Sequence, residues 1–151
     1  MRRKDREIES RVLIDNVINN AKVCRVAMCN NKLPYIVPLC FGYDGDHIYF
    51  HTATEGMKIH YMIANEQVCF EFENDVKIIK SDDLACDWSF SYYSVIGFGS
   101  VKEITEIKRK IFALNQIMKH YSEKEWEFER QMIEKTRLWF ITIEQITGKH
   151  R

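Results

Sequence analysis

The stretch that decides the fold is residues 24–58, which read CRVAMCNNKLPYIVPLCFGYDGDHIYFHTATEGMK. Apolar runs at 23–28 and 34–43 are rich in the residue types that favour β-strands. Asp44-Gly45 joins the second run to a third at 47–51, an arrangement typical of a β-hairpin. The stretch therefore predicts consecutive antiparallel strands.

The rest of the chain adds helices on both sides and further strands. Apolar spacing and turn signals predict strands at 67–73, 75–79, 90–101 and 138–146. They predict helices at 5–22, at 55–65 capped by Thr54, at about 107–118 capped by Thr105, and from a capping box of Ser122 and Glu125 to about 135. Strands linked by hairpins indicate an α+β class that is mainly β, with an antiparallel sheet or barrel.

Pro38 lies inside the predicted strand at 34–43. Proline has no N–H to donate to a neighbouring strand. The residue therefore predicts a sheet edge, a bulge, or a place where a ligand covers the backbone.

Composition limits the classes of function. The 151 residues suit a single domain over 1–151, and 46% are hydrophobic. Basic and acidic residues number 22 each, which argues against a protein built mainly to bind nucleic acid. No apolar run approaches the roughly 20 residues of a membrane helix, and the charged N-terminus does not resemble a signal peptide. We therefore expect no membrane partner and a cytoplasmic location.

Five cysteines are spread through the chain without a CxxC pair. Four of them lie in apolar, strand-like runs, where cysteine behaves as a small hydrophobic residue. Zinc sites and disulfide frameworks have closer spacing. We therefore expect buried free thiols in a reducing compartment. For a metal site, His51 and His60 are the candidate ligands. No carboxylate lies at a useful spacing from them, so we expect no metal site.

The segment from Thr54 to Lys58 has the features of an anion site. The first N–H groups of a helix lack partners and carry partial positive charge. Gly56 allows close approach of a ligand, and Lys58 adds a full positive charge. An ordinary capped helix with a surface lysine explains the same residues, so both interpretations stay open.

Two side chains near this segment are candidates for a role in binding. Alternation places Arg25 and Ala27 on one face of their strand. A guanidinium on a strand indicates either an anion ligand or an ion pair, and the sequence favours neither. His51 ends its strand near an apolar surface, where a histidine is more often structural than catalytic.

Signatures of other chemistries are missing. The chain has no GxSxG elbow, and Gly97-Phe98-Gly99 precedes no helix of the dinucleotide-binding kind. The aromatic run from Trp88 to Tyr93 could stack on a flat ligand, form a dimer contact, or pack in the core.

Together, the blocks CRVAM, LPYIVPLCFGYDGDHIYFHTATEGMK, VCFEFE and YYSVIGFGSV resemble the pyridoxamine 5′-phosphate oxidase-like flavin-binding split barrels. The resemblance covers roughly residues 10–147 and is strongest to the nitroimidazole-resistance branch. It implies a six-stranded antiparallel split barrel flanked by helices. It also implies a homodimer that holds one FMN in each of two interface clefts, with FAD as the alternative cofactor.

The resemblance also implies roles for individual residues. Lys58 would bind the phosphate, and His51 would act in any chemistry. Residues of the same chain would line the ring and ribityl chain: Arg25, Val26, Ala27, Pro38, Leu39, Phe50, His51, Thr52 and Ala53. The second subunit would contribute Trp88, Tyr92, Ser94 and Val95.

Three functions are compatible with these residues. The first is a flavin-dependent oxidoreductase that reduces a small, electron-poor, nitroaromatic-like substrate, which His51 positions or protonates. The second is a flavin or nucleotide carrier without turnover, because a fold does not fix a function. The third is a haem-binding barrel, for which no histidine has an evident axial role. The resemblance does not support vitamin B6 oxidation. True pyridoxamine phosphate oxidases recognise their substrate with a C-terminal segment of arginine and tryptophan, whereas Arg137 and Trp139 of this chain begin a strand.

Overall fold

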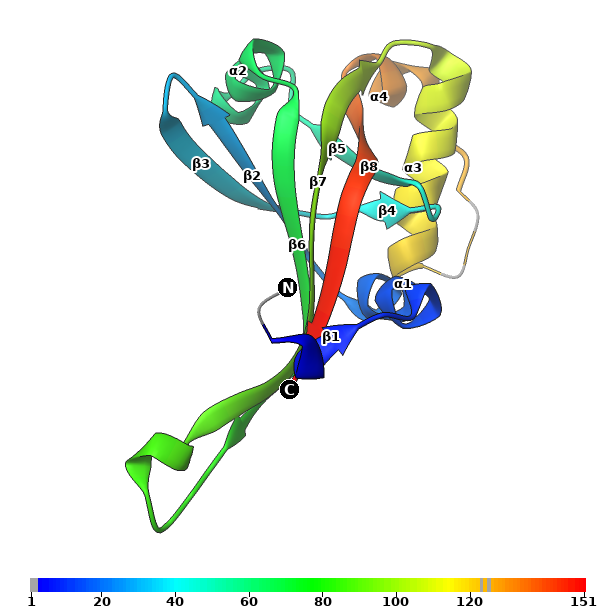
Figure 1. Cartoon of the computed structure of the whole chain (residues 1–151). Helices are drawn as coiled ribbons and strands as arrows, with labels where there is room; N and C mark the ends of the chain where they lie inside the picture. Colours follow the sequence, from blue (N-terminus) through cyan, green and yellow to red (C-terminus); the bar gives the residue numbers. More distant parts are fainter. Residues whose placement is uncertain (1–2, 123, 125) are drawn as a thin grey trace.

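The computed structural model describes residues 3–122, 124 and 126–151. Within these residues, eight strands form one sheet with antiparallel pairing throughout (Figure 1). The strands are β1 (Glu7–Ile8), β2 (Cys24–Asn30), β3 (Leu33–Leu39), β4 (Gly42–Tyr43), β5 (His47–Thr52), β6 (Gln67–Ile79), β7 (Ser89–Ile104) and β8 (Arg137–His150). The helices are α1 (Arg11–Asn20), α2 (Met57–Ala64), α3 (Ile107–Tyr121) and α4 (Arg130–Glu134), with 3-10 turns at Lys4–Arg6 and Ala85–Asp87.

The sheet has the form predicted for a split barrel. Its strand order is β3-β2-β6-β7-β8-β5-β4, and β1 pairs with β8. Six of the strands have six or more residues, and the other two, β1 and β4, have two each. β3 and β4 follow each other in the chain but lie at opposite ends of the strand order, so the sheet is not closed. The mainly antiparallel α+β fold is therefore confirmed.

Two apolar clusters hold the sheet in this shape. The larger fills the curl of the sheet and includes Phe41, Phe70 and Phe72, which are fully buried. The smaller lies between the outer side of β5 and β8 and helix α3, around Tyr49 and Leu138. Successive residues of β5 therefore serve different clusters, as the period of two in a strand requires.

A two-stranded arm extends from the main sheet. β6 and β7 continue to pair as far as Ile79 and Ser89, beyond a register shift between Asn74 and Lys77. Figure 1 shows the arm projecting away from the other elements. Exposed apolar side chains along it are Val76, Ile78, Ile79, Leu84, Trp88 and Phe90. Two-stranded ribbons of this kind are only marginally stable alone in water.

The predicted strands are confirmed with some changes of boundary. The strand expected at 34–43 is interrupted between Leu39 and Gly42, where the chain passes from β3 to β4 at the other end of the sheet. Pro38 lies on β3, which is an edge strand. Of the three explanations given for this proline, the sheet edge is therefore confirmed. Tyr43 pairs with Ile48 across the predicted hairpin.

The helix starts differ more from the predictions. α1 begins at Arg11 after a Ser10 cap, because residues 7–8 pair with β8 instead. α2 is preceded by Gly56 at φ +141°, so Thr54 is not its cap.

The two C-terminal helices also depart from the sequence prediction. Glu106, and not Thr105, occupies the N-cap position of α3, and its side chain makes no capping hydrogen bond. The capping box includes Glu125, which lies outside the described residues, and α4 begins only at Arg130. None of the described helices is long and apolar enough to cross a membrane.

The prediction of buried cysteines is wrong for most of them. Cys24 is buried, but Cys29, Cys40 and Cys86 are exposed and Cys69 is half-buried. Cys29 lies on the outer side of β2, which the core does not cover. All five are free thiols.

Gly42 allows α3 to approach the sheet. A Cβ atom at this position would lie 2.4 Å from the Gln116 carbonyl carbon and 2.5 Å from the Ile117 nitrogen, both in the backbone of α3. Backbone atoms cannot move aside unless the whole helix shifts. The glycine is therefore needed for close packing.

We expect Gly42→Ala to lower the free energy of unfolding by about 3 kcal/mol, the upper end of overpacking costs. Gly45→Ala is the comparison, because Gly45 has φ +106° but open space around its Cβ position. Its cost of about 1 kcal/mol comes from backbone strain alone. Urea unfolding measures both, and a loss at Gly42 no larger than that at Gly45 contradicts the packing argument.

Candidate functional site

The start of α2 is open to a ligand. Gly56 precedes the helix, and its carbonyl accepts the first helical hydrogen bond from the Ile59 N–H at 3.0 Å. No side chain caps this end. Lys58, the second residue of the helix, is half-buried. Unpaired N–H groups beside a lysine can bind an anionic group.

Residues at the ends of β5 and β8 support the segment before this helix. The Trp139 indole N–H donates to the Thr52 hydroxyl at 3.1 Å, and both residues are buried. The Thr52 hydroxyl donates to the Ala53 carbonyl at 2.8 Å. These contacts fix the chain at the point where it leaves the sheet for Lys58.

Arg137 lies on the same side of β8 as Trp139. Its guanidinium carbon is 5.0 Å from the centre of the Trp139 ring, and its Nη1 is 3.5 Å from the Thr54 carbonyl oxygen. It donates to the Glu103 carboxylate on β7 at 2.8 Å. Hydrogen bonds from Arg137 hold the pKa of the Glu103 carboxyl below its usual value. A cation paired with Glu103 therefore lies beside the segment that leads to Lys58.

Sequence reasoning did not assign Arg137, Glu103 or Trp139 to the site. Arg137 is opposite Thr52 across the β5–β8 ladder, and Glu103 is opposite Trp139 across the β7–β8 ladder. These pairs are far apart in sequence, so only the strand register brings them together. The sequence signal for this cluster is a basic residue, Arg137, directly before the last predicted strand at 138–146.

The predicted flavin residues divide between the two faces of the sheet. Those with buried side chains are Val26, Leu39, Phe50, Thr52 and Val95. Those that are exposed or half-buried are Arg25, Ala27, Pro38, His51, Ala53, Lys58, Trp88, Tyr92 and Ser94. In this arrangement, the almost fully buried Val26, Phe50 and Val95 can present only backbone atoms to a ligand.

His51 lies on the opposite face of β5 from Phe50 and Thr52. It continues the face of Tyr49, which packs against α3, but it is itself exposed. No other described residue makes a hydrogen bond with its ring, so protein contacts leave both imidazole nitrogens available.

Arg25 forms an ion pair on the outer side of the sheet. It is opposite Pro38 on one side and Glu71 on the other. Its Nη1 lies 2.9 Å from a Glu71 carboxylate oxygen and 3.6 Å from one of Glu73. The ion-pair interpretation of Arg25 is therefore correct, and an anion would have to compete with these carboxylates.

A shallow apolar groove of about 460 Å³ lies on the same outer side. It contains two of the predicted flavin residues, Tyr92 and Ser94. Its other lining residues are Glu71, Glu73, Val76, Phe90, Ile96 and Lys149. A flat apolar ligand or the surface of another chain could fill this groove.

Trp88 does not meet the α2 site within one chain. The arm that carries it lies at the opposite end of the molecule from α2 (Figure 1). Its indole N–H donates to the Ser81 carbonyl at 2.6 Å, within the arm itself. Among the described residues, no group of three or more histidine, cysteine or acidic side chains could hold a metal ion.

Comparison with solved structures adds related proteins. A candidate 5-nitroimidazole antibiotic resistance protein from Bacteroides thetaiotaomicron is 30% identical, with a TM-score of 0.85 over 95% of this chain and 86% of that one. The flavocytochrome Anf3 from Azotobacter vinelandii is 17% identical, with a TM-score of 0.84 over 100% of this chain and 72% of that one. The FAD and heme binding protein from Mycobacterium smegmatis is 17% identical, with a TM-score of 0.85 over 96% of this chain and 73% of that one. The last two share the fold.

Comparison with sequence families shows the family to which the chain belongs. No curated protein matches the chain. A family model described as pyridoxamine 5′-phosphate oxidase matches residues 10–150, nearly all of the fold. The chain therefore belongs to the pyridoxamine 5′-phosphate oxidase family.

Proposed function

We propose that the protein binds FMN between two copies of the chain and passes electrons to a small, electron-poor, nitroaromatic-like acceptor. The observation that carries this proposal is the open start of α2, with Lys58 in its first turn and Arg137 beside the segment that precedes it. The similar Bacteroides protein, named for 5-nitroimidazole resistance, suggests the kind of acceptor.

The residues present fit the two ends of FMN. Lys58 and the unpaired N–H groups of α2 suit a phosphate, because both positive charge and hydrogen-bond donors are available. The outer face of the sheet suits a ring, because Ile36, Ile96 and Phe98 expose apolar side chains there. FAD remains the alternative, since the same phosphate contacts would serve it.

A second copy is the partner that suits this exposed face. Ile36 is 59% exposed and Phe98 is 51% exposed, and the arm adds further apolar side chains. Contiguous apolar surface of this kind marks an interaction site. A symmetric partner would also bring its own Trp88 and Tyr92, which lie far from α2 within one chain.

The protein residues would have separate tasks in the reaction. A bound flavin supplies the capacity to accept and donate electron pairs. Lys58 and the α2 N–H groups would hold the phosphate, and Thr52 and Trp139 would fix the preceding backbone. His51 is exposed, and its ring makes no hydrogen bond to another described residue; it would orient the acceptor or give it a proton. We place this activity in the cytoplasm, where exposed free thiols such as Cys29 and Cys86 would stay reduced.

A flavin carrier without turnover is the second candidate. Catalytic bases and acids are usually oriented by a further group. No described residue makes such a contact with the His51 ring, which favours a carrier. The same site would then bind flavin without reducing an acceptor.

Replacing Lys58 tests the phosphate assignment. We expect Lys58→Ala to weaken FMN binding about 10- to 100-fold, the effect of losing a charge-assisted contact. Riboflavin lacks the phosphate, so its affinity is expected to change little. Titration of apoprotein by flavin fluorescence measures both, with Lys102→Ala, an exposed lysine on β7, as control. Equal losses for FMN and riboflavin would refute the assignment.

Replacing Ile96 tests the second copy. We expect Ile96→Glu to convert a dimer into monomers and to release flavin, because a carboxylate would enter an apolar interface. Light scattering and flavin absorbance measure the two effects. Met132→Glu, at an exposed apolar position on α4, is the control and is expected to leave both unchanged. A wild-type monomer that retains its flavin contradicts the interface.

Anaerobic reduction separates the enzyme from the carrier. We expect a nitroimidazole to reoxidise the reduced flavoprotein, and His51→Ala to slow this step about 100-fold, the usual contribution of a general acid. His60→Ala, an exposed histidine on α2, is the control. If no nitro compound reoxidises the reduced wild-type protein, the reductase proposal fails and the carrier stands. A Soret band in the purified protein would point to haem instead.

A further inference from the structure

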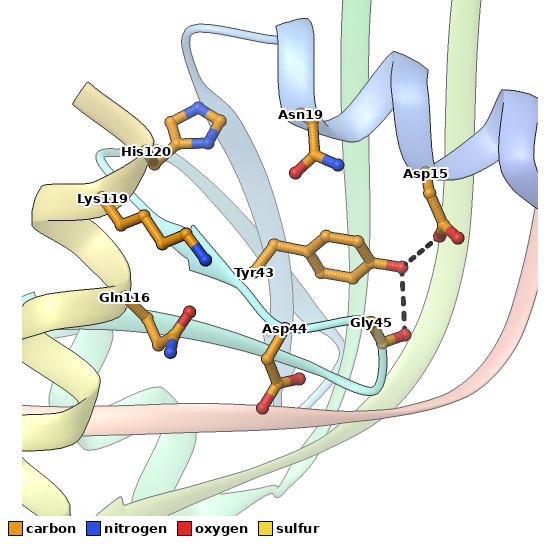
Figure 2. Close-up of a pocket in the computed structure, with 8 residues that line it drawn as sticks. All are labelled: Asp15, Asn19, Tyr43, Asp44, Gly45, Gln116, Lys119 and His120. Atoms are coloured by element: carbon orange, nitrogen blue, oxygen red, sulfur yellow. Dashed lines mark hydrogen bonds between the residues drawn. The ribbon is translucent and has the colours of Figure 1, made fainter. Parts of the chain in front are cut away.

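A separate polar pocket lies between α1, α3 and the turn from β4 to β5 (Figure 2). Its volume is about 640 Å³, within the range of small-molecule sites. None of the predicted flavin residues lines it. The lining residues are Asp15, Asn19, Tyr43, Asp44, Gly45, Gln116, Lys119 and His120.

The Tyr43 ring gives the pocket a rigid floor. The ring packs against the main core cluster. Its hydroxyl lies 2.6 Å from Asp15 Oδ1 and 3.0 Å from the Gly45 carbonyl, and it accepts a hydrogen bond from Arg11 at 2.9 Å. Contacts on every side of the hydroxyl fix the ring, so a ligand would meet a preformed aromatic surface.

Three polar side chains converge on this floor without a partner of their own. Figure 2 shows the Asn19 amide pointing down from α1, and the Lys119 amine and the Gln116 amide reaching in from α3. None of the three side chains makes a hydrogen bond to another described residue. Their donors and acceptors are therefore available to a ligand.

The other polar groups are held in defined states. Burial raises the pKa of Asp44, but hydrogen bonds from the Tyr49 hydroxyl and two backbone amides outweigh it and lower that pKa. The carboxylate is thus an acceptor at neutral pH. His120 Nε2 lies 2.8 Å from the Ala21 carbonyl oxygen, which can only accept, so Nε2 carries a proton. In the neutral ring, Nδ1 is then an acceptor as well.

The charges around the pocket balance. The carboxylates of Asp15 and Asp44 are matched by the Lys119 amine and by Arg11, which bonds to Asp15 at 2.9 Å. A phosphate or a free carboxylate would therefore find no excess of positive charge. A neutral ligand is favoured.

The arrangement of the polar groups narrows the class of neutral ligand. In Figure 2, Asn19 lies above the Tyr43 ring, Lys119 and Gln116 lie beside it, and Asp44 lies below it. Together these side chains mix donors with acceptors. A pyranose has an apolar C–H face and hydroxyls around its whole rim, and each hydroxyl both donates and accepts. A nucleobase has its polar atoms confined to its edges in fixed donor or acceptor roles.

We propose that this pocket binds a neutral pyranose sugar. Its C–H face would lie on the Tyr43 ring, and its hydroxyls would bond to Asn19, Gln116, Lys119 and Asp44. The proposal does not depend on flavin binding.

The test uses the full chain and four sugars as probes: glucose, galactose, mannose and N-acetylglucosamine. We expect saturation-transfer NMR and calorimetry to detect at least one, with a Kd of about 1 mM. Asn19→Ala and Lys119→Ala are each expected to raise that Kd about tenfold. Lys108→Ala is the matched control, because Lys108 is an exposed lysine on α3 like Lys119. It is expected to leave the Kd unchanged.

Three results would overturn the proposal. One is no binding by any of the four sugars at about 50 mM, well above the expected Kd. Another is sugar binding that Asn19→Ala and Lys119→Ala leave unchanged, which would place the sugar elsewhere. The third is tighter binding of adenosine or of a zwitterionic amino acid than of any sugar, weakened by Asn19→Ala and Lys119→Ala, which would assign the pocket to another class of ligand. Flavin absorbance of each variant is expected to equal that of the wild type, which keeps this test separate from the flavin proposal.

Discussion

The pairing of β7 with both β6 and β8 is the constraint on which the rest of the structure depends. β7 is the longest strand, and its ladders run along most of its length. Two glycines make this possible. A Cβ at Gly97 would lie 2.2 Å from the Phe70 ring, and one at Gly99 would lie 2.1 Å from the Thr142 carbonyl oxygen. The close approach lets the sheet curl around the larger of its two apolar clusters.

Curling gives the sheet an inner and an outer side, and this division organises the candidate site. β5 ends and β8 begins at the same edge of the sheet, where Thr52, Trp139 and Arg137 fix the chain that leads to Lys58. The outer side carries apolar groups and the Arg25 ion pair. One chain thus offers a polar end and an apolar face but does not enclose a ligand between them. This incompleteness is the main physical argument for a second copy.

The sequence predicted what depends on local rules. Hairpin residues located β4 and β5, and alternation placed Arg25 and Ala27 on one face of their strand. Pro38 gave a sheet edge as one of its three explanations. The sequence did not predict contacts set by register, such as the bond from Trp139 to Thr52, which are 87 positions apart. It also missed the Gly56 cap, because a threonine two residues earlier satisfied the usual rule. The sequence did not predict the arm. No local pattern of residues indicates that β6 and β7 stay paired beyond the rest of the sheet.

β5 connects the two candidate binding regions while keeping them apart. In the turn just before it, Asp44 accepts from the Tyr49 hydroxyl and borders the polar pocket. At its end, Thr52 bonds to Trp139 and the chain turns toward Lys58. The strand has six residues, so the two regions are separated by roughly 20 Å at the usual rise. Ligands at the two ends would not touch, but both would draw on the same strand. β5 and the core that packs against it are therefore one physical connection between the two regions. A second is α3, which lines the polar pocket and whose Lys110 amine donates to the Thr136 carbonyl, beside Arg137, at 3.0 Å.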